Sequence, residues 1–120
     1  MLTLFTVTLI VELFFALGFI AVPGALFGSF GVTPDAFGLA LARMFGSALL
    51  AFVILLYYAR AKSNPDLNKA VVRSLFAYWL FSSVFLIMAQ LAGIFNVMGW
   101  STILLHVGFL IWYGTYAFKK

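Results

Sequence analysis

The chain contains no cysteine and few charged residues. Three acids and seven basic residues make up 8% of its 120 positions, against roughly a quarter in a typical globular domain. Without cysteine the chain can form no disulfide, no thiolate nucleophile and no Cys-ligated zinc or iron–sulfur centre. The low charge content points away from a soluble domain and toward a chain surrounded by lipid.

Motifs for catalysis and cofactor binding are also missing. There is no HExxH helix, glycine-rich phosphate loop, paired-carboxylate spacing or Ser/His/Asp set, so no enzyme activity is expected. A single histidine cannot supply two axial haem ligands. We therefore expect no metal and no cofactor. Seven basic residues do not form a patch on a soluble fold, so no nucleic-acid partner is expected either.

Long apolar stretches fill most of the chain instead. They cover residues 2–22, 37–58, 71–91 and 100–118. A bilayer core of about 30 Å needs about 20 apolar residues at a rise of about 1.5 Å each. Runs without period-two alternation indicate helices rather than a barrel. Short connectors make neighbours antiparallel. The sequence predicts an all-α polytopic membrane protein, with residues 1–120 forming one up-down-up-down four-helix transmembrane bundle.

The first apolar stretch is expected to stay in the protein as a helix. A cleaved signal peptide begins with a basic segment, and the first eleven residues contain no lysine or arginine. Glu12 would also interrupt the apolar core of such a peptide.

Basic residues lie on only one side of this arrangement. The first connector contains Asp35 but no basic residue, and the third contains no charge. The positive-inside rule then places the second connector and both termini in the cytoplasm. The residues on which this orientation depends are Arg60, Lys62, Lys69, Arg73, Lys119 and Lys120.

Helix ends are predicted from turn and capping residues. Pro23-Gly24 should end the first helix. Thr33 is expected to cap the second, with Pro34 in its first turn. Asn64 should cap the third in the same way, and Ser101 can cap the fourth.

Small residues at four-residue spacing predict where helices approach closely, within one chain or between chains. These positions are Gly38, Ala42 and Gly46 in the second helix and Ala89 and Gly93 in the third.

Each predicted helix carries one strongly polar side chain within its span, namely Glu12, Arg43, Gln90 or His106. Counted by rise per residue, all four can meet in one layer in the outer half of the membrane. Supporting polar residues at helical spacing are Thr8, Ser47, Ser83, Thr102 and Tyr113. One interpretation is a structural ion pair between Glu12 and Arg43, with hydrogen bonds from the other two. The other is a pocket for a quinone or lipid headgroup, or a proton-relay step.

Two stretches, residues 31–46 and 92–102, resemble those of a family of small bacterial four-helix membrane proteins. The resemblance is carried by Arg-x-x-Gly at Arg43 and Gly46 and by Asn-x-x-Gly-Trp at Asn96, Gly99 and Trp100. It implies the four-helix topology and the bacterial cytoplasmic (inner) membrane. It implies no activity.

Two functions follow as expectations. The first is a non-catalytic accessory or structural subunit of a larger membrane complex, in contact with membrane lipids and with other membrane-protein subunits or copies of itself. The alternative is a small membrane binding or transport protein that uses the buried polar layer.

Overall fold

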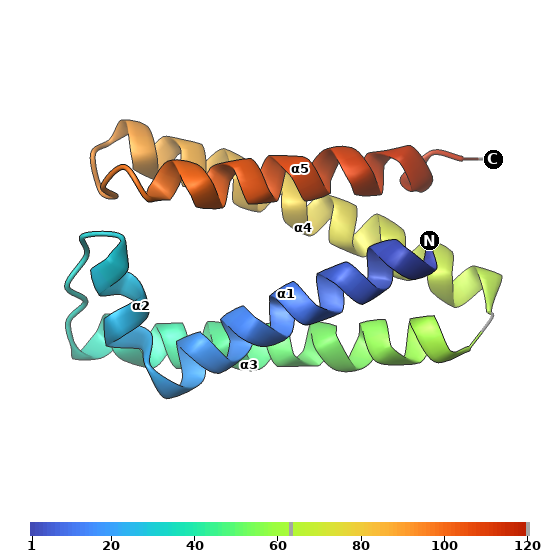
Figure 1. Cartoon of the computed structure of the whole chain (residues 1–120), viewed down its shortest axis with the longest axis horizontal. Coiled ribbons are helices and arrows are strands. Elements are labelled where there is room, and N and C mark those ends of the chain that lie inside the picture. The colour runs from blue at the N-terminus through green and yellow to red at the C-terminus, as the bar shows by residue number, and fades with distance from the viewer. Residues whose placement is uncertain (63, 120) are drawn as a thin grey trace. The chain divides into compact units, whose positions relative to one another are not determined.

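The computed structural model describes residues 1–62 and 64–119, and the regular structure in these ranges is helical (Figure 1). The helices are α1 (Leu2–Ala21), α2 (Pro23–Ser29), α3 (Ala36–Ala61), α4 (Pro65–Leu91) and α5 (Gly99–Ala117). The four long ones fall on the four predicted apolar stretches, and α2 was not predicted. Lys120, expected in the basic tail, lies outside the described residues.

Three of these helices are long and apolar enough to cross a membrane, namely α1, α3 and α4, with 20, 26 and 27 residues. The fifth helix, α5, has 19 residues, but residues such as Thr102, His106 and Trp112 lower its mean hydropathy. Within the described residues, length and composition therefore support a multi-pass membrane protein with three clear candidate spans.

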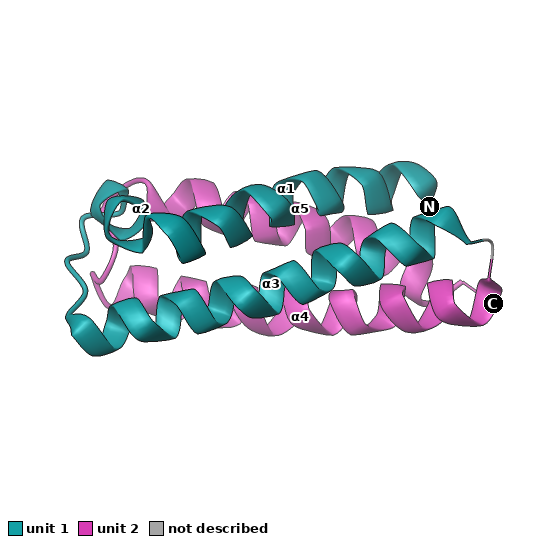
Figure 2. Cartoon of the chain, turned by 90° about the horizontal axis from the view of Figure 1, so that it is seen from below, with its two compact units in different colours: residues 1–63 teal, residues 64–120 magenta. Residues whose placement is uncertain are grey.

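The chain divides into two compact units, Met1–Ser63 and Asn64–Lys120 (Figure 2). In the first unit α1 packs against α3, and the short helix α2 lies in the connection between them. In the second unit α4 packs against α5. Each unit is thus a helical hairpin with its own internal packing.

The start of α2 shows what Pro23 does in this chain. The first helix ends at Ala21, and after Val22 a new seven-residue helix begins with Pro23. Proline lacks an N–H that the first helical turn leaves unpaired, and its fixed φ suits that turn. The Pro-Gly pair therefore both follows the end of α1 and opens α2, which the sequence analysis missed.

Of the three predicted helix caps, one is confirmed. Asn64 caps α4 as predicted, and its Oδ1 accepts hydrogen bonds from the N–H groups of Asp66 and Leu67, each at 3.1 Å. The prediction for Thr33 is wrong, because Asp35 caps α3 by accepting from Gly38 N–H at 2.7 Å. Ser101 does not cap α5, since its hydroxyl donates to the Met98 carbonyl oxygen at 2.6 Å.

The contact between α1 and α3 is close at Gly46. A Cβ at this position would lie 2.9 Å from Phe19 Cβ, 2.9 Å from Ile20 Cγ1 and 3.0 Å from the Ala16 carbonyl oxygen. Ala42, one turn earlier, is also buried. Small residues here let two backbones approach within one chain. Gly38 differs, because a Cβ there would meet Pro34 and Asp35 of its own helix start.

Gly93 serves the end of α4 rather than helix packing, since a Cβ there would meet nothing within 4 Å. The packing role of Ala89 stays a prediction. Gly93 has φ +74° and donates its N–H to the Gln90 carbonyl oxygen at 3.0 Å. Ile94 N–H donates to the Ala89 carbonyl oxygen at 3.1 Å. This pair of bonds is the Schellman motif, in which a left-handed glycine satisfies the last carbonyl groups of a helix.

Candidate functional site

Glu12 is the one acid within the apolar part of the first unit. It lies on α1 and is 2% exposed. Its Oε1 atom has no hydrogen-bond partner among the described residues. Thr8, one turn away, is buried as well, and its hydroxyl donates to the Leu4 carbonyl oxygen at 2.9 Å. Neither oxygen of Glu12 lies in an ion pair within the described ranges.

Arg43 does not pair with Glu12. It lies on α3 seven residues after Ala36, and its side chain is exposed. In residues 1–62 and 64–119 its guanidinium forms no ion pair and no hydrogen bond, so the expected Glu12–Arg43 pair is corrected here. Ser47, expected to support it, is exposed and donates to the Arg43 carbonyl oxygen at 3.0 Å.

The face that α3 buries explains this difference. Ala42, Gly46 and Leu49 are buried, at the i, i+4 and i+7 spacing of one helix face. Arg43 follows Ala42 directly and so lies about 100° around the helix from it. That the Arg43 side chain is long enough to reach the predicted depth of Glu12 therefore did not imply that the two side chains face each other.

Gln90, in the second unit, holds the turn between α4 and α5. Its Nε2 donates to the carbonyl oxygens of Phe95 and Asn96 at 3.3 and 3.2 Å. Its Oε1 is buried without a hydrogen-bond partner among the described residues. A Cβ added to Gly99 would collide with that oxygen. The amide thus fills the space that Gly99 leaves open.

His106 is bonded within its own helix. Its Nδ1 lies 2.9 Å from the Thr102 carbonyl oxygen, and because a carbonyl can only accept, Nδ1 carries the proton. The imidazole packs edge-on to the Trp79 indole, with ring centroids 4.8 Å apart. Thr102 therefore supports His106 through its backbone and not its hydroxyl.

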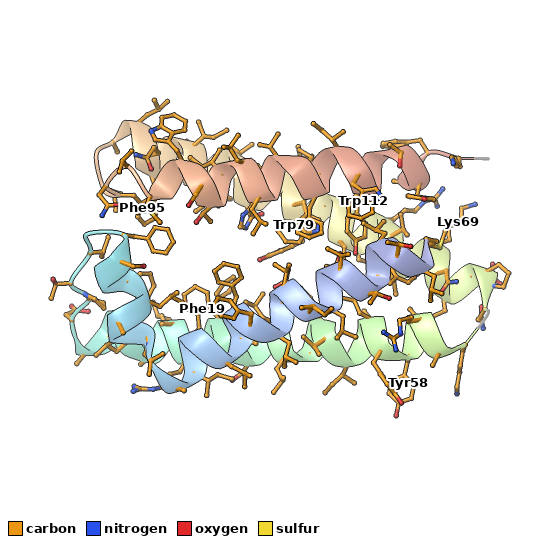
Figure 3. All side chains as sticks on the ribbon, viewed as in Figure 1. Phe19, Tyr58, Lys69, Trp79, Phe95 and Trp112 are labelled. Carbon is orange, nitrogen blue, oxygen red and sulfur yellow. The ribbon has the colours of Figure 1, made fainter. Side chains whose placement is uncertain are left out.

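Trp79 is the residue that the sequence analysis overlooked. It lies near the middle of α4 (Figure 3). Its side chain is 1% exposed and stacks on Phe109 of α5, with ring centroids 4.7 Å apart. Its buried Nε1–H has no hydrogen-bond partner in the described part of the chain. The sequence did contain a signal for it. Tryptophan in membrane helices favours the interfaces, whereas Trp79 lies well inside the predicted stretch 71–91. Ser83, one turn on, donates to the Trp79 carbonyl oxygen at 2.6 Å.

The polar residues within each unit do not meet. In the first unit the Glu12 side chain is buried, whereas the Arg43 side chain is exposed. In the second, His106 packs against Trp79, eleven residues before Gln90, or about 16 Å along α4. Tyr113 is fully buried beside Phe109, with ring centroids 6.5 Å apart. A layer formed by all four polar residues stays a prediction.

No group of three or more metal-ligating side chains that could hold an ion occurs among the described residues. Comparison with protein-family models, with curated proteins and with solved structures gives no match to this chain.

Proposed function

We propose that this chain is a non-catalytic subunit of a larger integral-membrane assembly. In this proposal it crosses the bacterial inner membrane four times, with both termini in the cytoplasm. The observation that supports it best is the exposed guanidinium of Arg43 on an apolar helix, which has no partner among residues 1–62 and 64–119.

Arg43 is a charged residue in an otherwise apolar part of α3. Phe37 and Met44, on other faces of the same helix, are 71% and 68% exposed, and Leu41 and Phe45, also on other faces, are exposed too. Arginine keeps its charge at any physiological pH. A charge within hydrocarbon costs a few kcal/mol or more unless a partner satisfies it. A neighbouring membrane helix that carries an acid would supply both the negative charge that Arg43 lacks and an apolar contact for the exposed side chains around it.

The fourth crossing is supported by how α5 accompanies α4. At one end Gln90 packs against Gly99, and near the middle Trp79 stacks on Phe109. At the other end Phe76 contacts Phe118 with ring centroids 5.2 Å apart. If α4 spans the bilayer, α5 runs back beside it for its full length. At about 1.5 Å per residue, its 19 residues reach about 28 Å.

Replacing Arg43 by methionine should release the chain from its assembly. Losing one partner of a buried charge pair typically costs about 2–5 kcal/mol, or a weakening of about thirtyfold or more. The tagged chain should be purified in mild detergent from cells that express it at low level. Native mass spectrometry should then find a partner subunit with the wild type and not with Arg43→Met.

The matched control is Arg60→Met, the same substitution in the last turn of the same helix. It should keep the partner. A wild-type chain that purifies alone would contradict the proposal. If the partner subunit still co-purifies with Arg43→Met, the charge of Arg43 does not hold the assembly together. It would then be paired with another group, for example with lipid headgroups about 10 Å away along α3. A quinone in the lipid extract would favour the binding-protein alternative.

A further inference from the structure

Three basic side chains gather at one end of the second unit. Lys69 and Arg73 lie one turn apart on α4, and Lys119 follows the end of α5. The Lys69 side chain extends from α4 toward the end of α5 (Figure 3). We call this set the basic cluster.

Contacts between the two helices hold the cluster together. Arg73 Nε donates a long hydrogen bond of 3.5 Å to the Ala117 carbonyl oxygen. Phe76, less than a turn further on, packs edge-on against Phe118. The end of α5, and with it Lys119, is therefore fixed beside the third and fourth turns of α4, next to the turn that carries Lys69.

The positive charges of the cluster are not neutralised within the described part of the chain. None of the three side chains forms an ion pair there. Lys119 Nζ lies 4.8 Å above the ring centroid of Tyr116, a contact that leaves its charge in place. The only acid close in sequence is Asp66, which is exposed in the first turn of α4.

Arg73 keeps most of its donors for a ligand. A guanidinium has five N–H groups in a planar fork, and the bond to Ala117 uses one of them. Capping the carboxyl end of α5 accounts for that single bond. It does not account for the remaining four donors of Arg73 or for Lys69.

We propose that the basic cluster binds the phosphate of an anionic phospholipid at the membrane surface. Forked guanidinium donors match phosphate oxygens, and lysines add point charges. Tyr116, within one turn of Lys119, belongs to a residue type enriched at headgroup depth. The site places its phosphate where α4 and α5 leave the bilayer, and the apolar Phe76–Phe118 pair lies next to it for the glycerol and first acyl carbons. This site goes beyond the proposed function and rests on one part of it, the crossing of the bilayer by α4 and α5.

The test is binding of phosphatidylglycerol to the full chain in a neutral detergent, measured by native mass spectrometry with phosphatidylcholine as the competitor. Arg73→Gln/Lys119→Gln removes one arginine and one lysine from the cluster. Arg60→Gln/Lys62→Gln removes the same two residue types from the end of the first unit. Each surface cation contributes about fivefold, so the cluster variant should bind about thirtyfold more weakly. The control should keep wild-type affinity and preference.

Equal losses in the two variants would overturn the site and leave only general attraction by positive charge. Unchanged binding in the cluster variant would overturn it as well. Glycerol phosphate, added as a soluble competitor, should not displace the lipid; displacement at similar concentration would show a free-anion site instead. If Arg73→Gln unfolds the chain, Lys69→Gln/Lys119→Gln changes only exposed side chains and should give the same loss.

Discussion

Gly46→Leu should separate α1 from α3 and unfold the first unit. Even the first carbon of a side chain would lie 2.9 Å from Phe19 Cβ and 3.0 Å from the Ala16 carbonyl oxygen, and the latter belongs to backbone that cannot turn aside. Overpacking of a close contact typically costs about 1–3 kcal/mol. Because leucine adds four carbons, we expect about 3 kcal/mol or more. The measurement is thermal unfolding in detergent, followed by circular dichroism.

Gly108→Leu is the control for this experiment. Gly108 lies within α5, and a Cβ at this position would meet nothing within 4 Å. Leucine is a better helix former than glycine by up to about 1 kcal/mol, so this variant should be as stable as the wild type or more so. Equal destabilisation by the two substitutions would contradict the close approach at Gly46.

Gly99→Ala should open the turn between α4 and α5. The added methyl group would collide with Gln90 Oε1 and lie 2.7 Å from Phe95 Cβ. Moving Gln90 away would break its bonds to the carbonyl oxygens of Phe95 and Asn96. Lost hydrogen bonds and overpacking together should cost about 2–4 kcal/mol. The readout is again thermal unfolding in detergent.

A double-mutant cycle with Gln90→Ala separates the clash from other effects of the new methyl group. Shortening Gln90 makes room for the alanine at position 99, so the double variant should be more stable than the sum of the single losses implies. The recovery should be partial, because Phe95 stays in place. Strict additivity would mean that Gln90 does not occupy the space above Gly99.

The long helices could be predicted because their signal is long. About 20 consecutive apolar residues leave little choice of structure in lipid, and α1, α3, α4 and α5 begin and end close to the expected positions. The apolar stretch 71–91 does not reach the start of α4, but the predicted Asn64 cap does, and the helix begins at Pro65. The seven residues of α2 have no such length, and the Pro23 that opens it also reads as a stop signal.

The candidate site was harder to predict, because depth along a helix says nothing about direction around it. Arg43 lies at the expected position along its helix, yet Ala42 and Gly46 set the face that meets α1. Gln90 and His106 find hydrogen-bond partners in their own turn and helix. Polar side chains in lipid need partners, but the nearest backbone carbonyl can serve as well as a distant side chain.

The central claim, four crossings with both termini in the cytoplasm, can be tested by cysteine accessibility, since the chain has no native cysteine. Single cysteines at five exposed positions, Thr3, Ser29, Lys62, Val97 and Lys119, should be probed in intact spheroplasts with a thiol reagent that cannot cross membranes. The proposal predicts labelling at positions 29 and 97 at once, and at positions 3, 62 and 119 only after permeabilisation. Labelling of positions 97 and 119 from the same side would contradict it, because α5 would then not cross the membrane.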